Sequence, residues 1–155
     1  MSNYIFGYCQ TAPLYEEDRE SLLGSVREKT SLGFHILEPN QIPLAYKAPS
    51  GSDYIYFIIS DDNSTLLASY LIFESDWADN ANTSLPRPLG DRIALMIQTV
   101  GVLLSELAPR ELSLIISESD QIEGQRTMSF KEFSEVVYSD FQSRGIPCLV
   151  YHIRQ

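Results

Sequence analysis

The segment from Leu89 to Leu107 carries the strongest structural signal in the chain. Its apolar residues recur at intervals of mostly three and four, which is the spacing of one helical face. Further apolar residues, among them Leu95, Ile97 and Val102, fall on other faces of the same helix. A helix that is apolar on several sides needs neighbours on several sides. We therefore expect this helix to form the core of a folded domain.

Strand and helix patterns flank this segment on both sides. Two further helices are expected at 14–30 and 129–144, and strands at 3–9, 34–37, 53–60, 65–73, 111–117 and 148–153. A turn-like sequence, Asp61-Asp62-Asn63-Ser64, separates the runs 53–60 and 65–73, so we expect these runs to pair as a hairpin. Strand 111–117, helix 129–144 and strand 148–153 together have the length of a strand–helix–strand crossover unit. This predicts that segments 111–117 and 148–153 are parallel.

These elements define one domain and one fold class. A chain of 155 residues, 44% hydrophobic and 21% charged, has the size and composition of a single globular domain, here 1–155. The hairpin would supply antiparallel strands and the crossover unit a parallel pair. We predict an α+β fold in which a single mixed sheet of about five to six strands is packed by about three helices.

Charge and segment composition exclude several classes of function. Eleven basic residues against 21 acidic ones give a net charge of −10, which repels nucleic acids and anionic lipid surfaces. No apolar run approaches the length of about 20 residues that a membrane span requires. The N-terminus lacks the pattern of a secretory signal. We expect a cytoplasmic protein that binds neither nucleic acid nor membranes.

Cofactor, metal and catalytic patterns are missing as well. The chain has no glycine-rich phosphate loop, and its two histidines, His35 and His152, do not stand at metal-ligand spacings. Cys9 and Cys148 form no CxxC motif, so in a reducing compartment we expect two buried thiols. A Cys–His catalytic pair would require the first and last strands to be neighbours. We expect no cofactor and no metal.

The most uneven feature of the sequence is the placement of its acidic residues. No Lys or Arg occurs from Ala48 to Pro86 or from Glu111 to Gln125. Acidic residues in these stretches follow predicted strands, where loops project into solvent, and the only tryptophan, Trp77, stands among them. An aromatic side chain surrounded by carboxylates suits a cleft lined by Lys and Arg. We predict a partner-binding surface made of Asp61, Asp62, Glu74, Asp76, Trp77, Asp79, Glu118, Asp120 and Glu123.

In size, acidity and lack of catalytic motifs, the chain resembles small acidic immunity proteins of bacterial toxin–immunity pairs of the contact-dependent inhibition type. Two acidic segments, Glu74 to Asp79 and Glu118 to Glu123, are the local part of this resemblance. The resemblance implies a non-catalytic inhibitor that forms a one-to-one complex and covers the active site of a basic toxin domain. Such a toxin is typically a nuclease, whose cleft is cationic because its substrate is polyanionic. The carboxylates would then take the place of phosphates.

Three alternatives stay open at the level of sequence. In the first, the acidic loops are plain solvated surface and Trp77 packs over the core. In the second, the chain is a small enzyme that uses carboxylates such as Asp53 or Asp91, which requires a pocket with shifted carboxylate pKa values. In the third, it is a non-catalytic adaptor or assembly subunit, with helix 89–107 contributing to a symmetric interface.

Overall fold

The computed structural model describes residues 3–11, 14–49, 53–77, 83–119 and 121–155. Within these residues the chain forms one six-stranded sheet and three α-helices, which confirms the predicted α+β fold. The helices are α1 (Glu16–Lys29), α2 (Leu89–Leu107) and α3 (Phe130–Arg144). The strands are β1 (Asn3–Gln10), β2 (Gly33–Leu37), β3 (Tyr54–Ser60), β4 (Glu111–Glu118), β5 (Gly124–Ser129) and β6 (Leu149–Arg154).

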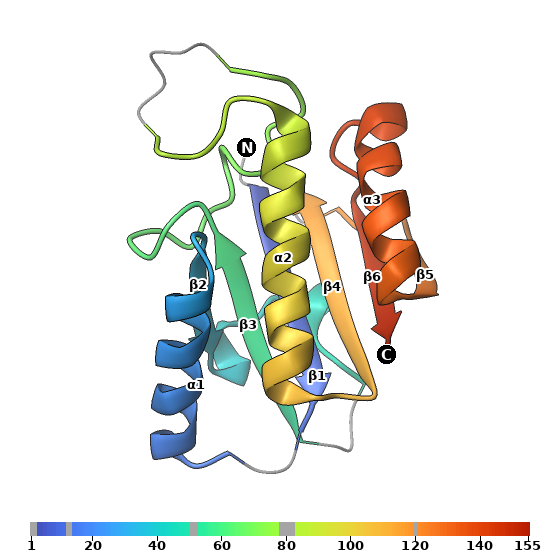
Figure 1. Ribbon diagram of the computed structural model, residues 1–155. Helices are drawn as coiled ribbons and strands as arrows, with labels where there is room; N and C mark the ends of the chain where they lie inside the picture. Colours follow the sequence, from blue (N-terminus) through green and yellow to red (C-terminus); the bar gives the residue numbers. More distant parts are fainter. Residues whose placement is uncertain (1–2, 12–13, 50–52, 78–82, 120) are drawn as a thin grey trace.

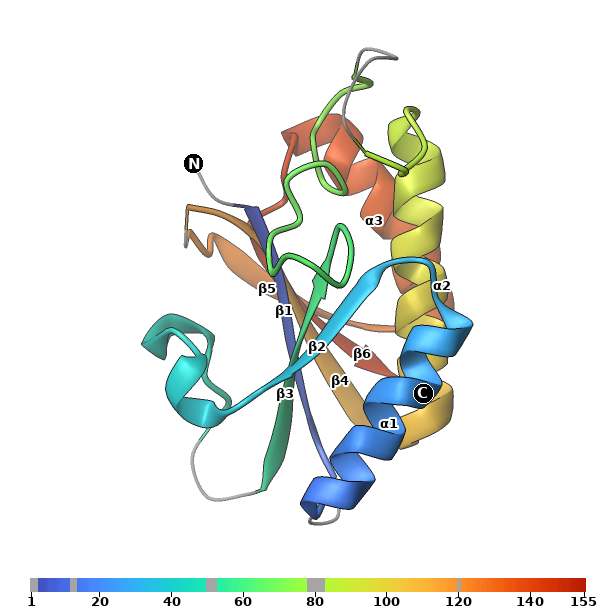
Figure 2. The same ribbon diagram turned by 90° about the vertical axis from the view of Figure 1, so that its left-hand side faces the viewer.

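The sheet is mixed and is covered by helices on one face. Its strand order is β2-β3-β1-β4-β6-β5, and every neighbouring pair is antiparallel except β5 and β6. The three α-helices lie on the same face, with α2 between α1 and α3 (Figures 1 and 2). The segment with two short 3-10 turns, Pro39–Gln41 and Leu44–Tyr46, lies on the opposite side of the sheet (Figure 2).

The main core fills the space between the sheet and the helices. Met96 and Leu103 of α2 are completely buried there. Leu95, Ile97 and Val102 are partly buried and pack against the same core, as expected for a helix with α1 on one side and α3 on the other. The apolar residues of α2 thus pack against other parts of the same chain. The adaptor alternative requires them at an interface between subunits instead. No helix among the described residues is long and apolar enough to cross a membrane.

The predicted hairpin between segments 53–60 and 65–73 is wrong. Strand β3 pairs with β1 on one side and with β2 on the other, so neither of its edges is free for a further strand. Segment 65–73 instead forms turns after the end of β3, in which Ala68, Leu71 and Ile72 are buried. The apolar residues that favoured a strand therefore serve the burial of an irregular loop.

The predicted parallel pairing of segments 111–117 and 148–153 is also wrong. Strands β4 and β6 are neighbours, but they run antiparallel. The parallel partner of β6 is β5, a strand that the sequence analysis did not predict, and α3 forms the crossover between the two. β5 is an edge strand with the polar sequence Gln125-Arg126-Thr127, so it lacks the apolar run by which interior strands are predicted.

The two cysteines are buried and lie in different parts of the sheet. Strand β4 separates β1, which contains Cys9, from β6, which Cys148 precedes. The first and last strands are therefore not neighbours. Burial raises the pKa of the Cys9 thiol to about 12, which keeps it protonated at neutral pH.

Candidate protein-binding surface

Strands β3 and β4 bring predicted acidic residues to one end of the sheet. Both strands run antiparallel to β1, which lies between them, so their C-terminal ends lie at the same end of the sheet. Asp61 and Asp62 follow β3, and Glu118 is the last residue of β4. The described residues between β3 and α2, 61–77 and 83–88, lie at this end (Figure 1). Asp79 and Asp120 lie outside the described residues.

The segment of residues 61–77, here called the 61–77 loop, folds around the buried carboxylate of Asp61. This residue is 8% exposed and accepts backbone hydrogen bonds from Leu71 at 2.8 Å and from Tyr70 at 3.1 and 3.2 Å. Burial raises the pKa of Asp61, and the hydrogen bonds from Leu71 and Tyr70 oppose that shift. Asp61 therefore stabilises the loop and offers little of its surface to a partner.

Arg92 of α2 holds the same loop from the helix side. It is completely buried, and its guanidinium donates hydrogen bonds to the carbonyl oxygens of Tyr70 at 2.6 Å, Phe73 at 2.9 Å and Ser75 at 2.7 Å. It also donates to the carbonyl oxygen of Arg87 at 3.1 Å. One side chain thus satisfies several backbone acceptors of an irregular segment and fixes its course.

Asp76 and Trp77 attach the end of the loop to α2. The Asp76 carboxylate accepts a hydrogen bond of 3.0 Å from the backbone N–H of Leu89, at the helix N-terminus, where negative charge is stabilising. The guanidinium carbon of Arg92 lies 4.0 Å from the centroid of the Trp77 ring, within the range of a cation–π contact. Trp77 is partly buried and packs against the main core. This is the packing that the plain-surface alternative expects of Trp77.

Arg92, which supports this surface from the core, is a residue that the sequence analysis missed. It stands four residues before Met96 and eleven before Leu103, on the buried face of α2. A lone arginine on an apolar face was the available signal, since a buried guanidinium needs hydrogen-bond acceptors. The pattern does not identify those acceptors, because the carbonyl groups of the loop lie 17 to 22 residues away in the sequence.

The 61–77 loop exposes apolar side chains close in sequence to carboxylates. Leu66, Tyr70 and Phe73 are 45%, 37% and 42% exposed, although large apolar residues are usually buried. Asp62 and Glu74 are exposed as well, and the loop contains no Lys or Arg. The sequence analysis assigned segment 65–73 to a strand, so it did not predict these exposed side chains. The loop therefore combines a fixed backbone, apolar contact surface and negative charge.

The second acidic stretch reaches the same end of the sheet. Glu118 is partly exposed and pairs with Asn3 of β1. Glu123 is exposed, and its backbone N–H donates to the carbonyl oxygen of Cys148 at 2.7 Å, next to the start of β6. Because β6 runs antiparallel to β4, β6 begins at the end of the sheet where β4 finishes. The structure thus places Glu118 and Glu123 at the same end of the sheet as Asp61 and Asp62, whereas Glu111 lies at the opposite end.

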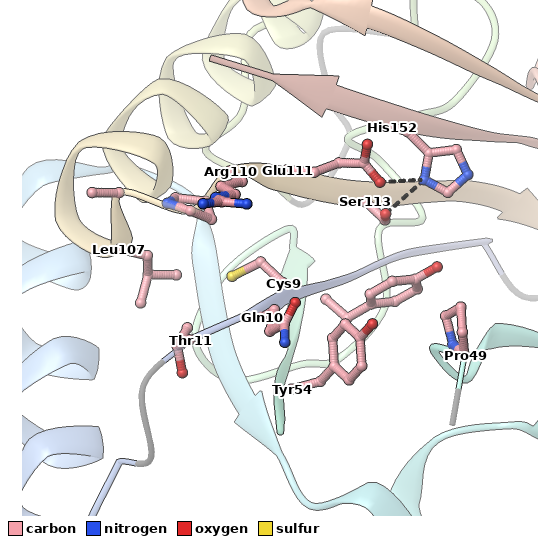
Figure 3. A pocket seen from close by; sticks show the side chains of 13 residues that line it. Cys9, Gln10, Thr11, Pro49, Tyr54, Leu107, Arg110, Glu111, Ser113 and His152 are labelled. Atoms are coloured by element: carbon pink, nitrogen blue, oxygen red, sulfur yellow. Dashed lines mark hydrogen bonds and ion pairs between the residues drawn. The ribbon is translucent and has the colours of Figure 1, made fainter. Parts of the chain in front are cut away.

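A serine, a histidine and a carboxylate meet elsewhere on the sheet without the geometry of a hydrolytic triad. Ser113 Oγ lies 2.7 Å from Nδ1 of His152, and Glu111 Oε1 lies 3.5 Å from the same nitrogen (Figure 3). A triad places the serine and the carboxylate on opposite ring nitrogens. Here Nε2 lies 2.8 Å from Oε1 of Gln125. The arrangement therefore lacks the proton relay of a serine hydrolase.

Other groups considered for chemistry are dispersed. Asp53 and Asp91, the carboxylates of the enzyme alternative, are both exposed, Asp91 in the first turn of α2 and Asp53 just before β3. Among the described residues, no group of three or more His, Cys, Asp or Glu side chains is placed to hold a metal ion. Comparisons of the chain with known protein families, curated proteins and solved structures found no match.

Proposed function

We propose that this protein is a non-catalytic inhibitor that binds a basic protein partner through the 61–77 loop and the acidic end of the sheet. The partner is of the class that the resemblance to immunity proteins implies, a toxin domain with a cationic active site such as that of a nuclease. One observation carries the proposal. A loop fixed by Arg92 exposes Leu66 and Phe73 together with the carboxylates of Asp62 and Glu74.

The exposed apolar side chains would supply most of the affinity. Protein interfaces derive most of their binding energy from a few large side chains that become desolvated in the complex. The carbonyl oxygen of Phe73 accepts a hydrogen bond from Arg92, so this side chain is attached to a fixed backbone. A surface that is ordered before binding loses less conformational entropy in the complex, which favours tight association.

The negative charge would supply speed and selectivity. The chain carries a net charge of −10, and four acidic residues and no basic ones occur between residues 61 and 77. Such a surface attracts cationic proteins from a distance and speeds their encounter. A nuclease cleft is built to hold phosphates, so carboxylates that enter it compete with the substrate. The acidic end of the sheet therefore suits the occlusion of that kind of cleft.

The test begins with the full-length tagged protein in a lysate of its own source organism. A single basic protein should co-purify in stoichiometric amount and be identified by mass spectrometry. With that partner purified, the association rate should fall as the salt concentration rises, because salt screens charge attraction. If the partner has nuclease activity, a one-to-one amount of this protein should abolish it. Association that is independent of salt would reject the electrostatic part of the proposal.

Matched variants then locate the binding surface. Phe73→Ser should weaken binding about tenfold or more, because a hot-spot side chain contributes at least about 1.4 kcal/mol. Tyr15→Ser is the control, since Tyr15 is 78% exposed beside the start of α1, at the other end of the molecule (Figure 1). Glu74→Gln should slow association, whereas Glu16→Gln on α1 should not. Equal affinities of folded Phe73→Ser and Tyr15→Ser would exclude the 61–77 loop as the interface.

A further inference from the structure

A second candidate site lies at the end of the sheet opposite to the 61–77 loop. A pocket of about 530 Å³ lies between the C-terminal end of β1, the starts of β3 and β4, and the turn that follows α2. Its volume is in the range of small-molecule sites in proteins. Figure 3 shows the side chains that line it. The pocket shares no residue with the 61–77 loop, so the inference below does not depend on the proposed function.

A row of hydrogen-bonded side chains forms one wall of this pocket. Tyr8 of β1 pairs in register with Ser113 of β4, which pairs with His152 of β6. Tyr8 stands beside Ser113 on the neighbouring strand, and Ser113 Oγ lies 2.7 Å from His152 Nδ1. Gln125 of the edge strand β5 continues the row, with Oε1 2.8 Å from His152 Nε2. The contacts among Ser113, His152 and Gln125 make this row an ordered polar surface beside Tyr8.

The protonation states along the row follow from these contacts. The amide oxygen of Gln125 only accepts hydrogen bonds, so Nε2 of a neutral His152 carries the proton. Nδ1 then accepts a hydrogen bond from the hydroxyl of Ser113. Burial raises the pKa of Tyr8, which keeps its hydroxyl protonated and able to donate. With a neutral His152 the wall carries no charge, and the charge of the pocket comes from its rim.

Two charged residues at the rim, Glu111 and Arg110, differ in their surroundings, because Glu111 has an ion-pair partner and Arg110 has none within the described part of the chain. Glu111 is the one acidic residue among the described lining residues, and its Oε2 accepts a hydrogen bond of 2.9 Å from Nε of Arg154. Arg110 lines the pocket, is exposed, and has no hydrogen bond or ion pair with any residue that the structure describes. A guanidinium without a partner suits a carboxylate or a phosphate, which it can bind through two parallel N–H bonds.

Two tyrosine rings supply flat apolar surface beside this charge. The rings of Tyr8 and Tyr54 have their centroids 5.6 Å apart and are perpendicular to each other. Both residues are only partly buried, and Figure 3 shows Tyr54 at the side of the pocket that Pro49 also lines. A perpendicular pair presents one ring face and one ring edge, and a flat ligand can pack favourably against either.

We infer that this pocket binds a small molecule with a flat apolar body and one oxyanion group. The oxyanion, a carboxylate or a phosphate, lies against Arg110, and the flat body packs against Tyr8 and Tyr54. The ordered row of Ser113, His152 and Gln125 lies beside Tyr8, and Tyr8 in turn contacts the ring of Tyr54. The binding is a property of this chain in addition to its interaction with a protein partner.

The test is a titration of the full-length, isotope-labelled protein, followed through its backbone amide resonances. The probes are benzoate, phenyl phosphate, benzamide and inorganic phosphate. Benzoate or phenyl phosphate should produce saturable shifts at Tyr8, Ser113 and His152, and the stronger of the two identifies the preferred oxyanion. Benzamide lacks the charge and inorganic phosphate lacks the ring, so each should bind about tenfold more weakly. No saturable shift with either aromatic anion would overturn the inference.

Variants assign the two parts of the ligand. Arg110→Gln should abolish the preference for the aromatic anion over benzamide, whereas Lys131→Gln, an equal change of charge at an exposed position of α3, should leave it intact. Tyr54→Leu should weaken the binding of the preferred aromatic anion and of benzamide alike, and so keep the preference for the anion. The amide spectrum shows in each case that the fold is retained. An unchanged preference in folded Arg110→Gln would overturn the assignment of the anion to this residue.

Discussion

The guanidinium carbon of Arg92 lies 4.0 Å from the ring centroid of Trp77, so a buried charge of α2 and the end of the 61–77 loop are in direct contact. The ring of Tyr70 meets Trp77 edge-on, with centroids 5.4 Å apart. Because Trp77 is the only tryptophan in the chain, its fluorescence reports on the packing of this loop. The contact between Arg92 and Trp77 therefore stabilises the loop of the proposed interface. The fluorescence of Trp77 makes the packing of that loop measurable.

Arg92→Lys should lower the free energy of unfolding by about 2–4 kcal/mol, because one ammonium cannot replace a guanidinium that serves several carbonyl groups. The native fluorescence of Trp77 should change at the same time. Denaturant unfolding followed by circular dichroism and by fluorescence measures both effects. Arg19→Lys, at an arginine of α1 paired at the surface with Glu38, is the control and should be nearly neutral. Wild-type stability of Arg92→Lys would show that the carbonyl contacts do not hold the loop.

Asp61→Asn should change how stability depends on pH. Burial raises the pKa of Asp61 above its ordinary value of 3.8, so the folded protein keeps this proton to higher pH than the unfolded chain does. Its contribution to stability therefore falls as the pH rises from 3.8 through the raised pKa. Unfolding measured from about pH 3 to about pH 7 should show wild type losing stability relative to the variant in that window. A relative gain of wild type with rising pH would contradict the raised pKa.

Both cysteines should be unreactive in the folded protein. Cys9 is 1% exposed and Cys148 is 6% exposed, and burial raises the pKa of Cys9 to about 12. Titration with a chromogenic disulfide reagent at about pH 8 should detect no fast thiol in the native state, because the thiolate is the reacting species. Two thiols should react after denaturation. A fast reaction at Cys9 in native protein would show that the core opens beside the pocket.

Ser113→Ala should lower the free energy of unfolding by about 1–2 kcal/mol, because it leaves Nδ1 of the partly buried His152 without its hydrogen-bond partner. Thermal or denaturant unfolding measures this loss. The control is Ser139→Ala at an exposed position of α3, where no measurable loss is expected. Equal stability of the two variants would mean that water replaces the Ser113 hydroxyl at no cost.

Elements with a clear local pattern were predicted close to their observed bounds. Helix 129–144 is an example, because Ser129 and Glu132 stand at the spacing of a capping box, and the structure has the Glu132 N–H donating to Ser129 Oγ at 3.1 Å. Strand β5 was missed because an edge strand needs no apolar run. Segment 65–73 was assigned to a strand because its composition is apolar, and nothing local shows that β3 already has two neighbours.

The candidate surface was predicted in part. The concentration of acidic residues follows from the sequence alone, and so does their position after strands. The sequence does not distinguish Asp61, which is buried and caps backbone N–H groups, from Asp62, which is exposed. It also singled out Trp77 as an anchor, whereas Phe73 is the more clearly exposed aromatic side chain of the loop.

By itself, the sequence determined the α+β class, the positions of the three helices and the negative charge of the chain, because these depend on local spacing and on composition. Only the tertiary structure decided which strands pair, which carboxylates reach solvent and which carbonyl groups accept hydrogen bonds from Arg92. The physical reason is that pairing, burial and the hydrogen bonds of an irregular loop depend on groups from distant parts of the chain. The guanidinium of Arg92 and the carbonyl oxygen of Tyr70, 22 residues apart, are one such pair.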